Sequence, residues 1–206
     1  MSDVGGSEHG QGAGAPVTLA ITGASGAPYA VRLLEALNAL RVPVRLVISS
    51  TGWRLLDEEL GLTTPDSLRE WTGDWSDVLL YDDMDRGATP ASGSAASRGM
   101  VICPCSMGTL ASIAQGTTRS LIERAADVCL KERRPLILVP RETPYSAIHL
   151  ENMLRLTRAG AVVLPASPGF YHRPKGIGEL VDFVVGRVLS QLGLRHEVGP
   201  VWRSGE

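Results

Sequence analysis

The sequence is short of cysteine, of net charge and of long apolar runs, and each shortage excludes a class of protein. Its 206 residues include three cysteines, at positions 103, 105 and 129, without the spacing of a disulfide framework, a C-x-x-C redox pair or a zinc site. A net charge of −2 argues against nucleic acid and acidic membranes as partners. No apolar run is long enough to span a membrane, and no signal peptide is visible. We therefore expect a cytoplasmic protein with reduced, structural cysteines.

Metal-binding patterns are lacking as well. The four histidines, His9, His149, His172 and His196, are scattered without the spacing of a zinc site. The run YDDMD at 81–85 has three aspartates, but not at the D-D-x-x-D spacing with which prenyl-diphosphate enzymes hold magnesium. We expect no metal.

The chain is long enough for one α/β domain with its own core and too short for two such domains. Residues 1–15 are rich in glycine and poor in apolar side chains, which predicts a disordered tail. Residues 16–206 then form the single domain.

Short apolar runs alternate with longer amphipathic stretches from residue 17 onward. The apolarity of the short runs is continuous, as in strands of a sheet covered on both faces. They predict strands at 17–22, 43–49, 99–104, 135–140 and 161–165, with a weaker candidate at 77–82. The amphipathic stretches predict helices at 27–39, 53–60, 108–114, 120–131, 147–159 and 177–192. This alternation predicts a three-layer α/β fold with a doubly wound parallel sheet of the Rossmann or flavodoxin-like type.

Sheets of this kind bind ligands at the carboxyl ends of their strands. The first strand-end loop, TGASGAP, contains Gly23 and Gly26, which permit close backbone approach, and it leads into a helix whose first N–H groups favour a phosphate. The loop lacks the G-x-G-x-x-G spacing, and the second strand ends in Ser49 and Ser50 and not in an acidic residue. A mononucleotide phosphate therefore fits better than a dinucleotide. A tight turn without a ligand is the alternative.

The loop CPCSMGT, after another strand, has two interpretations. Ser106, Gly108 and Thr109 open a helix, where hydroxyl and N–H groups can hold a phosphate or the polar edge of a ring. Alternatively, Ser106 is only a helix N-cap.

Two pairs of charged residues are equally open to interpretation. Arg124 and Lys131 lie seven residues apart near one helix face. Asp127 stands four residues before Lys131, so the spacing favours an ordinary solvated ion pair. Arg141 and Glu142 stand side by side where a buried strand ends. They indicate either a solvated loop or a site that handles an anion and a proton together.

Five stretches taken together resemble the UbiX-type flavin prenyltransferases. They are TGASGAPYAVRLL, PASGSAASRGMVICPCSMGTLASIAQG, LIERAADVCLKERRPLILVPRE, VPRETPYSAIHLENM and PGFYHRP. The resemblance covers residues 17–202, apart from about 61–84. It implies a flavodoxin-like subunit in a trimer-based homododecamer, and an enzyme that prenylates reduced FMN with dimethylallyl phosphate. The product, prenylated FMN, would be passed to a UbiD-type decarboxylase.

The resemblance also implies roles for residues, position by position. Those expected to contact FMN are Gly23, Ala24, Ser25, Ser49, Ser106, Met107, Gly108, Thr109 and Arg141. Those expected to bind the prenyl donor are Arg124, Lys131, Tyr171, Arg187 and Trp202, the last within a C-terminal segment, 193–206, that covers the site. Those expected to act in catalysis are Glu142, Ser25, Lys131 and Glu59. Glu142 would exchange a proton with the departing phosphate, and Glu59 would reach the site across a subunit interface.

One departure and two rival interpretations accompany this resemblance. Some relatives carry an aromatic residue before the ASGS run, in the loop facing the prenyl chain, where this sequence has Arg86. An aromatic face can stabilise an allylic cation, and an arginine cannot.

A flavin-dependent cysteine decarboxylase would have a P-x-M-N-x-x-M segment where this chain has PRETPYSAIHLENM. A non-catalytic flavin carrier would need the FMN contacts but no phosphate-binding cations.

Overall fold

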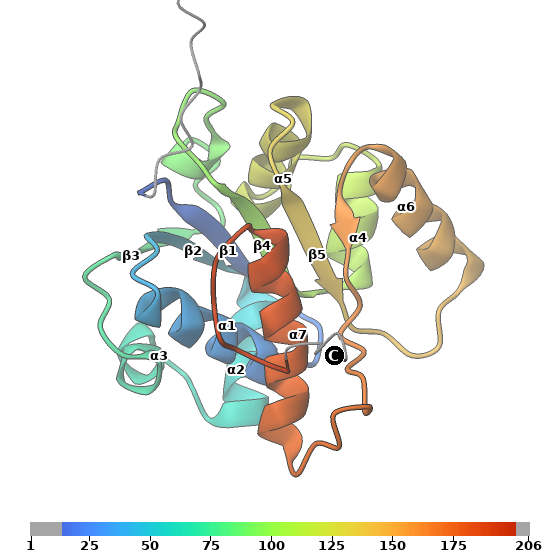
Figure 1. Cartoon of the computed structure of the whole chain (residues 1–206). Coiled ribbons are helices and arrows are strands. Elements are labelled where there is room, and N and C mark those ends of the chain that lie inside the picture. Colours follow the sequence, from blue (N-terminus) through green and yellow to red (C-terminus); the bar gives the residue numbers. More distant parts are fainter. Residues whose placement is uncertain (1–13, 201–206) are drawn as a thin grey trace, which may run out of the picture.

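The protein is built around a parallel β-sheet, whose strands are labelled side by side in Figure 1. The computed structural model describes residues 14–200. The sheet has six strands in the order β3-β2-β1-β4-β5-β6, and every neighbouring pair is parallel. The strands are β1 (Val17–Ile21), β2 (Val44–Ile48), β3 (Val78–Asp82), β4 (Gly99–Cys105), β5 (Leu136–Pro140) and β6 (Val162–Val163).

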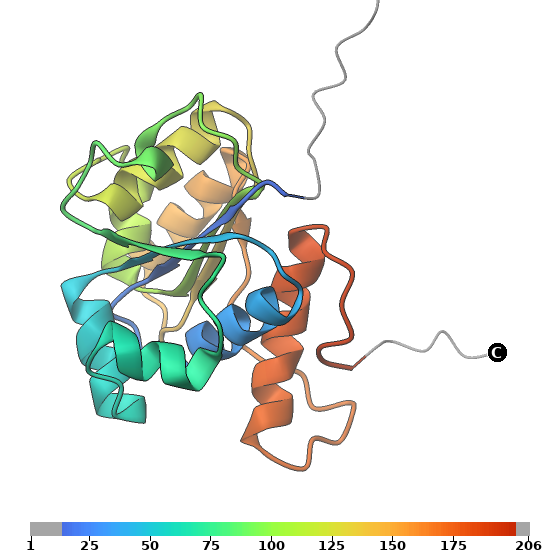
Figure 2. The ribbon, with the colours of Figure 1, turned by 90° about the vertical axis from the view of Figure 1, so that its left-hand side faces the viewer.

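Helices cover both faces of this sheet, as Figure 2 shows. On one face lie α1 (Ala27–Ala39), α2 (Ser50–Leu60), α3 (Pro65–Thr72) and α7 (Ile177–Gln191). On the other lie α4 (Met107–Ala114), α5 (Leu121–Lys131) and α6 (Ala147–Arg158), and a short 3₁₀ turn, η1 (Thr89–Ala91), packs against α5. The expected three-layer, doubly wound fold is confirmed.

The core follows from the alternation of side chains along each strand. In β1, Leu19 and Ile21 point to the α1 and α7 layer, whereas Ala20 points to the α4 and α5 layer. Because both sets are buried, the strand shows continuous apolarity in the sequence. The edge strand β3 is different, since Leu79 and Leu80 are exposed.

The strand order creates a crevice where the chain changes direction. The connections from β1 run one way through β2 and β3, and those from β4 run the other way through β5 and β6. The carboxyl ends of β1 and β4 therefore flank the switch point at which such sheets bind ligands. Thr22 joins these two ends, because its hydroxyl donates to Pro104 O at 2.8 Å and accepts from Ser106 N at 2.9 Å.

Several element boundaries differ from the sequence-based prediction. Helix α2 begins at residue 50 and not at 53, because Ser49 caps it by accepting from Gly52 N. Helix α3 was not predicted, and a capping box between Thr64 and Ser67 starts it. The predicted strand at 161–165 keeps only two residues as β6. Most of the predicted tail, residues 1–13, and the end of the predicted covering segment, residues 201–206, lie outside the described residues.

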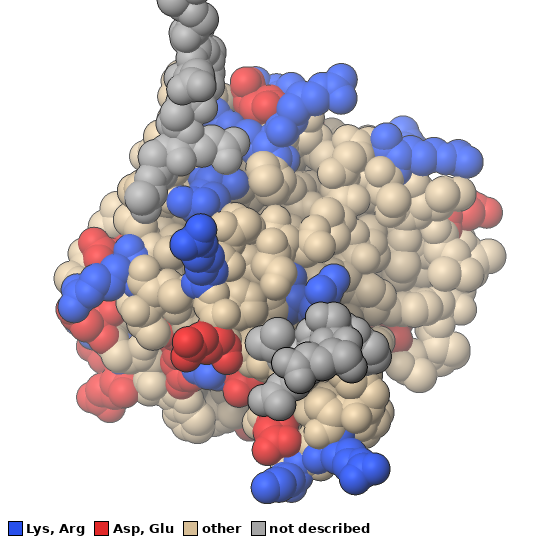
Figure 3. Space-filling view, in the orientation of Figure 1, with Lys and Arg blue, Asp and Glu red and all other residues tan. Residues whose placement is uncertain are grey.

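The surface and the helices add two observations. On the face shown in Figure 3, acidic and basic side chains occur in small groups of both signs and not as one field. Within residues 14–200, no helix combines the length and the apolarity needed to cross a membrane.

Candidate functional site

The loop after β1 is held by a carboxylate from α2. Glu59 accepts hydrogen bonds from Gly26 N at 3.0 Å and from Ala27 N at 2.8 Å, the first N–H groups of α1. A negative charge is favourable at this end of a helix. The structure therefore differs from the expectation that these N–H groups hold a phosphate, because a side chain of the same chain already accepts from them. Glu59, expected to reach across a subunit interface, lies here against its own loop.

The start of α2 packs closely against the end of β1. A Cβ on Gly23 would lie 2.5 Å from the Thr51 side chain, so this position has room only for glycine. A Cβ on Gly52 would lie 2.4 Å from the backbone oxygen of Ile21. Ser49, at the N-cap of α2, hydrogen-bonds to both Gly52 N and Thr51 Oγ1. The contacts bring three predicted FMN-binding positions, Gly23, Ala24 and Ser49, to one side of the crevice.

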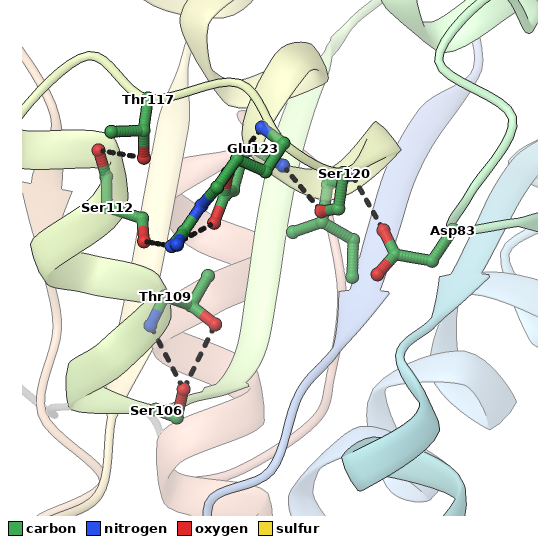
Figure 4. A network of polar contacts seen from close by, with 9 residues as sticks. Asp83, Ser106, Thr109, Ser112, Thr117, Ser120 and Glu123 are labelled. Carbon is green, nitrogen blue, oxygen red and sulfur yellow. Dashed lines mark hydrogen bonds and ion pairs between the residues drawn. The ribbon is translucent and has the colours of Figure 1, made fainter.

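The loop after β4 forms the other side of the crevice. Ser106 caps α4: its hydroxyl accepts from Thr109 N at 3.1 Å and lies 3.0 Å from Thr109 Oγ1 (Figure 4). Both interpretations of Ser106 remain compatible with this geometry, because the N–H groups of Met107 and Gly108, in the first turn, have no intrahelical acceptor. The two groups are free to donate to a ligand in the crevice.

A polar network fixes the other end of α4 to α5 (Figure 4). Arg119 donates to Ser112 Oγ at 2.7 Å, and its backbone N–H donates to Glu123 at 2.6 Å. Ser120 caps α5 by accepting from Glu123 N, and the Glu123 carboxylate accepts from Arg119 N and not from the cap residue. Asp83 completes the network by accepting from Ile122 N at 3.0 Å.

The network leaves Glu123 ionised although it is buried. Burial by itself would raise the pKa of this carboxyl, but hydrogen bonds from the Arg119 backbone and from Ser112, together with the Arg119 charge, lower it below its usual value. The buried charge is thus compensated, and the placement of α4 depends on it.

The predicted pair Arg141 and Glu142 follows β5 directly. Arg141 donates through Nε to the backbone oxygen of Ser25 at 3.0 Å, so it joins the β5 loop to the β1 loop. Its four remaining N–H groups point to no other described acceptor within hydrogen-bond distance, and a guanidinium suits an anionic ligand. Glu142 accepts only from Thr143 N, at 3.0 Å, among the described residues. Arg141 thus belongs to the crevice cluster with Ser25.

The predicted donor-binding cations on α5 do not join this cluster as a group. Arg124 pairs with Asp127 at 2.8 Å, and Lys131 pairs with Glu132. Lys131 lies beside Gly93, in the ASGS loop, where a Cβ would be 2.8 Å from its Nζ. Lys131 precedes β5 in the chain, and Arg141 follows this strand. The four residue steps of β5, from Leu136 to Pro140, span about 13 Å. One chain therefore does not bring Lys131 and Arg141 together.

Two other residues predicted to bind the donor line a separate cavity. Tyr171 and Arg187 both face a space of about 450 Å³ between α7 and the segment that follows it. The loop that carries Tyr171 starts beside the crevice, because Ala166 N donates to Pro140 O at 2.9 Å. Trp202 lies outside the described residues.

Two aspartates of the run at 81–85 take part in local turns. Asp82 and Asp85 accept from the backbone N–H groups of Met84 and Gly87 in local turns. Within residues 14–200, no group of three acidic, cysteine or histidine side chains is arranged to hold a metal ion. All three cysteines are free and buried, and burial raises the pKa of Cys105 to about 12 and that of Cys129 to about 11.

Sequence reasoning missed Thr22 and Gly52. The role of Thr22 depends on the register between β1 and β4, which the sequence does not show. Gly52 had a signal, since a glycine in the first turn of a helix frequently marks a close backbone approach.

Comparisons with known proteins identify the family and support the fold. A family model described as Flavoprotein matches residues 6–189. The flavin prenyltransferase UbiX of Pseudomonas aeruginosa is 50% identical over 194 residues, which cover 90% of this chain and 93% of that protein. The crystal structure of AnUbiX (PadA1) in complex with FMN and dimethylallyl pyrophosphate has a TM-score of 0.87 and 41% identity, covering 94% of this chain and 100% of that one. A dodecameric FMN-dependent UbiX-like decarboxylase from Escherichia coli O157:H7 has a TM-score of 0.85 and 41% identity, covering 92% and 100%.

The fold and the crevice between β1 and β4 are those of the flavoprotein class. Within that class, the chain belongs to the family of flavin prenyltransferases named UbiX. The resemblance found in the sequence motifs is confirmed.

Proposed function

We propose that this chain joins the dimethylallyl group of dimethylallyl phosphate to reduced FMN and so produces prenylated FMN. The observation that carries the proposal is the hydrogen bond from Arg141 to Ser25 O across the crevice. It brings the loops after β1 and β5 together beside those after β2 and β4. These four loops hold the positions at which relatives are expected to contact FMN.

The residues at the crevice fit an anionic flavin. Free N–H donors are available at the first turns of α2 and α4, and Arg141 adds a cation. We assign the FMN phosphate to these donors and not to the start of α1, where Glu59 accepts from Gly26 and Ala27. Bound reduced FMN would supply the electron pairs of the new C–N and C–C bonds. The C–N bond would replace the allyl C–O bond, whose electron pair leaves with the phosphate. The C–C bond would form at the prenyl double bond, which takes up a proton, while the flavin nitrogen and carbon that form the two bonds each release one.

The chain's own residues supply the proton and the charge that this departure needs. Tyr171 and Arg187 would hold the phosphate of the donor, since both line one cavity. Glu142 would donate a proton to the leaving phosphate, because a monophosphate leaves poorly while it is fully ionised. In the described residues Glu142 accepts only from Thr143 N and has no cation partner, so its carboxyl group is not held by an ion pair.

A second copy of the chain would complete the site. Lys131 and Gly93 lie toward the other end of the sheet, so they would reach a flavin only in a neighbouring subunit. Leu150 and Leu154, one turn apart on α6, are both exposed, and this apolar pair supports self-association. We propose a trimer-based dodecamer, the assembly size stated for the similar protein from Escherichia coli.

The covering segment, the location and the recipient are also proposals. Residues 193–200 lie against α7 beside the cavity of Tyr171 and Arg187, which supports a covering role for 193–206. Three free, buried cysteines favour the cytoplasm. A UbiD-type decarboxylase would receive the product.

The test is an anaerobic incubation of the purified protein with reduced FMN and dimethylallyl phosphate, followed by mass spectrometry of the extracted flavin. A mass increase of one C5 prenyl unit is expected. Unmodified flavin that stays bound, with both the phosphate and the diphosphate donor, would overturn the proposal and favour the carrier interpretation.

A further inference from the structure

The cavity that contains Tyr171 and Arg187 has a second guanidinium. Arg195, in the segment after α7, lines the same space of about 450 Å³. Ser190 and His196 add further polar groups to its wall. No aspartate or glutamate of residues 14–200 lines it. Two cations without a carboxylate in one cavity are the composition of an anion site.

Neither arginine is neutralised by the part of the chain that the structure describes. The other arginines near α7 and on α5 have close carboxylate partners: Arg32 pairs with Asp182 at 2.6 Å, and Arg124 with Asp127 at 2.8 Å. Arg187 and Arg195 make no ion pair and no side-chain hydrogen bond among the described residues. Their mutual repulsion is relieved when an anion binds between them.

The segment that carries Arg195 is anchored on α7. A Cβ on Gly186 would lie 2.3 Å from Val198 O, so the segment approaches the helix backbone directly. His196 Nδ1 accepts from Val198 N at 3.2 Å, which leaves the ring proton on Nε2, 3.0 Å from Ser190 Oγ. On the other side of Arg195, Leu194 N donates to Leu189 O at 3.1 Å. The position of the Arg195 backbone is thereby fixed from both sides.

We propose that Arg195 is a further donor-binding residue, which holds the distal phosphoryl group of a diphosphate donor while Arg187 and Tyr171 hold the proximal one. The inference rests on the proposed function and deepens it. It assigns to this chain the use of dimethylallyl diphosphate beside the monophosphate. The same allyl C–O bond breaks with either donor, its electron pair leaves with pyrophosphate in place of phosphate, and no oxidant or reductant enters.

The test compares Arg195→Gln and Arg195→Lys with the wild type, using the two donors in turn. For Arg195→Gln we expect the KM for the diphosphate to rise about tenfold to a hundredfold, the effect of losing one hydrogen bond to a charged group. The KM for the monophosphate and the affinity for FMN should change far less. Arg195→Lys should restore part of the diphosphate affinity. Arg158→Gln, on α6 at the opposite face of the sheet, removes the same charge and should change neither KM.

A second measurement separates this inference from the proposed function. Inorganic pyrophosphate is titrated into the FMN-loaded wild type and the variants by calorimetry, which needs no turnover. Weaker pyrophosphate binding by Arg195→Gln than by Arg158→Gln supports the anion site. This holds even if the wild type forms no prenylated flavin, because that failure would contradict only the proposed function. Equal pyrophosphate affinity in the wild type, Arg195→Gln and Arg158→Gln, or equal KM rises for both donors in Arg195→Gln, would overturn the role of Arg195.

Discussion

Replacing Glu59 by glutamine separates a structural role of this residue from a purely catalytic one. Both carboxylate oxygens accept N–H groups at the start of α1, Oε1 from Gly26 at 3.2 Å and Oε2 from Gly26 and Ala27 at 3.0 and 2.8 Å. The amide of glutamine keeps one acceptor, loses the negative charge and turns an NH₂ group toward N–H donors. A residue that acted only as a proton carrier would leave the fold unchanged.

The magnitude follows from the geometry at the helix start. A charge at a helix N-terminus contributes about 0.3–1 kcal/mol when exposed and up to about 2 kcal/mol when partly buried. Glu59 is half-buried and bidentate, so we expect a loss of about 2 kcal/mol in the free energy of unfolding. For a chain of this length that corresponds to a fall in Tm of about 4–8 °C. The β1 loop is part of the crevice, so FMN should also bind more weakly.

The assay is thermal unfolding and FMN titration of Glu59→Gln beside Glu58→Gln. Glu58 is the neighbouring residue on α2 and pairs with Arg54 on the surface, at 2.7 Å. Exposed ion pairs of this kind contribute little to stability, so the control should change neither property measurably. If Glu59→Gln kept the Tm and FMN affinity of the control and lost only turnover, the structural role argued here would be wrong.

Three further substitutions test other parts of the site. Glu123→Gln should destabilise the protein at pH 7, and the difference in unfolding free energy from the wild type should shrink below about pH 4. The pKa of Glu123 is lowered in the folded protein, so its stabilisation is complete above the unfolded-state pKa of about 4.3 and is lost as the pH falls through the folded-state pKa. Urea unfolding at several pH values measures this. Gly52→Ala places a Cβ 2.4 Å from Ile21 O and should cost about 1–3 kcal/mol of stability. Gly178→Ala, with open space at its Cβ, should be neutral or stabilising in the same melt and is its control. Glu142→Gln should retain FMN affinity while turnover falls at least about a hundredfold in the mass-spectrometric assay, and near-normal turnover would end its assignment as the acid.

Continuous apolarity was sufficient to predict the central strands. Strands β1, β4 and β5 are buried on both faces, so the sequence pattern and the fold express the same fact. Strand β3 was the weakest candidate because it lies at the edge, and α3 was missed because only Leu68 and Thr72 of its eight residues are buried. Its start signal, Thr64 followed by Pro65, is local and was present in the sequence.

The candidate site was only partly predictable, for a physical reason. The strand-end loops could be recognised, because parallel strands place their carboxyl ends at one edge. The hydrogen-bond partners of Glu59 could not be predicted, because they depend on how α2 packs on the end of β1. The separation of Lys131 from Arg141 could not be predicted either, because it depends on the direction of α5. Arg195 carries no motif, and its place in the cavity of Arg187 appears only once the chain has turned back along α7.

The two hydrogen bonds of the Thr22 hydroxyl restrict which residues can stand at that position. The hydroxyl is buried and acts as donor to Pro104 O and acceptor from Ser106 N, a combination that valine, of the same shape, cannot provide. Because the bonds form within the chain, the width of the crevice is set during folding and not by the ligand. The conformational entropy of shaping the flavin site is then lost once, on folding, and a rigid isoalloxazine ring can bind there without a large ordering cost of its own.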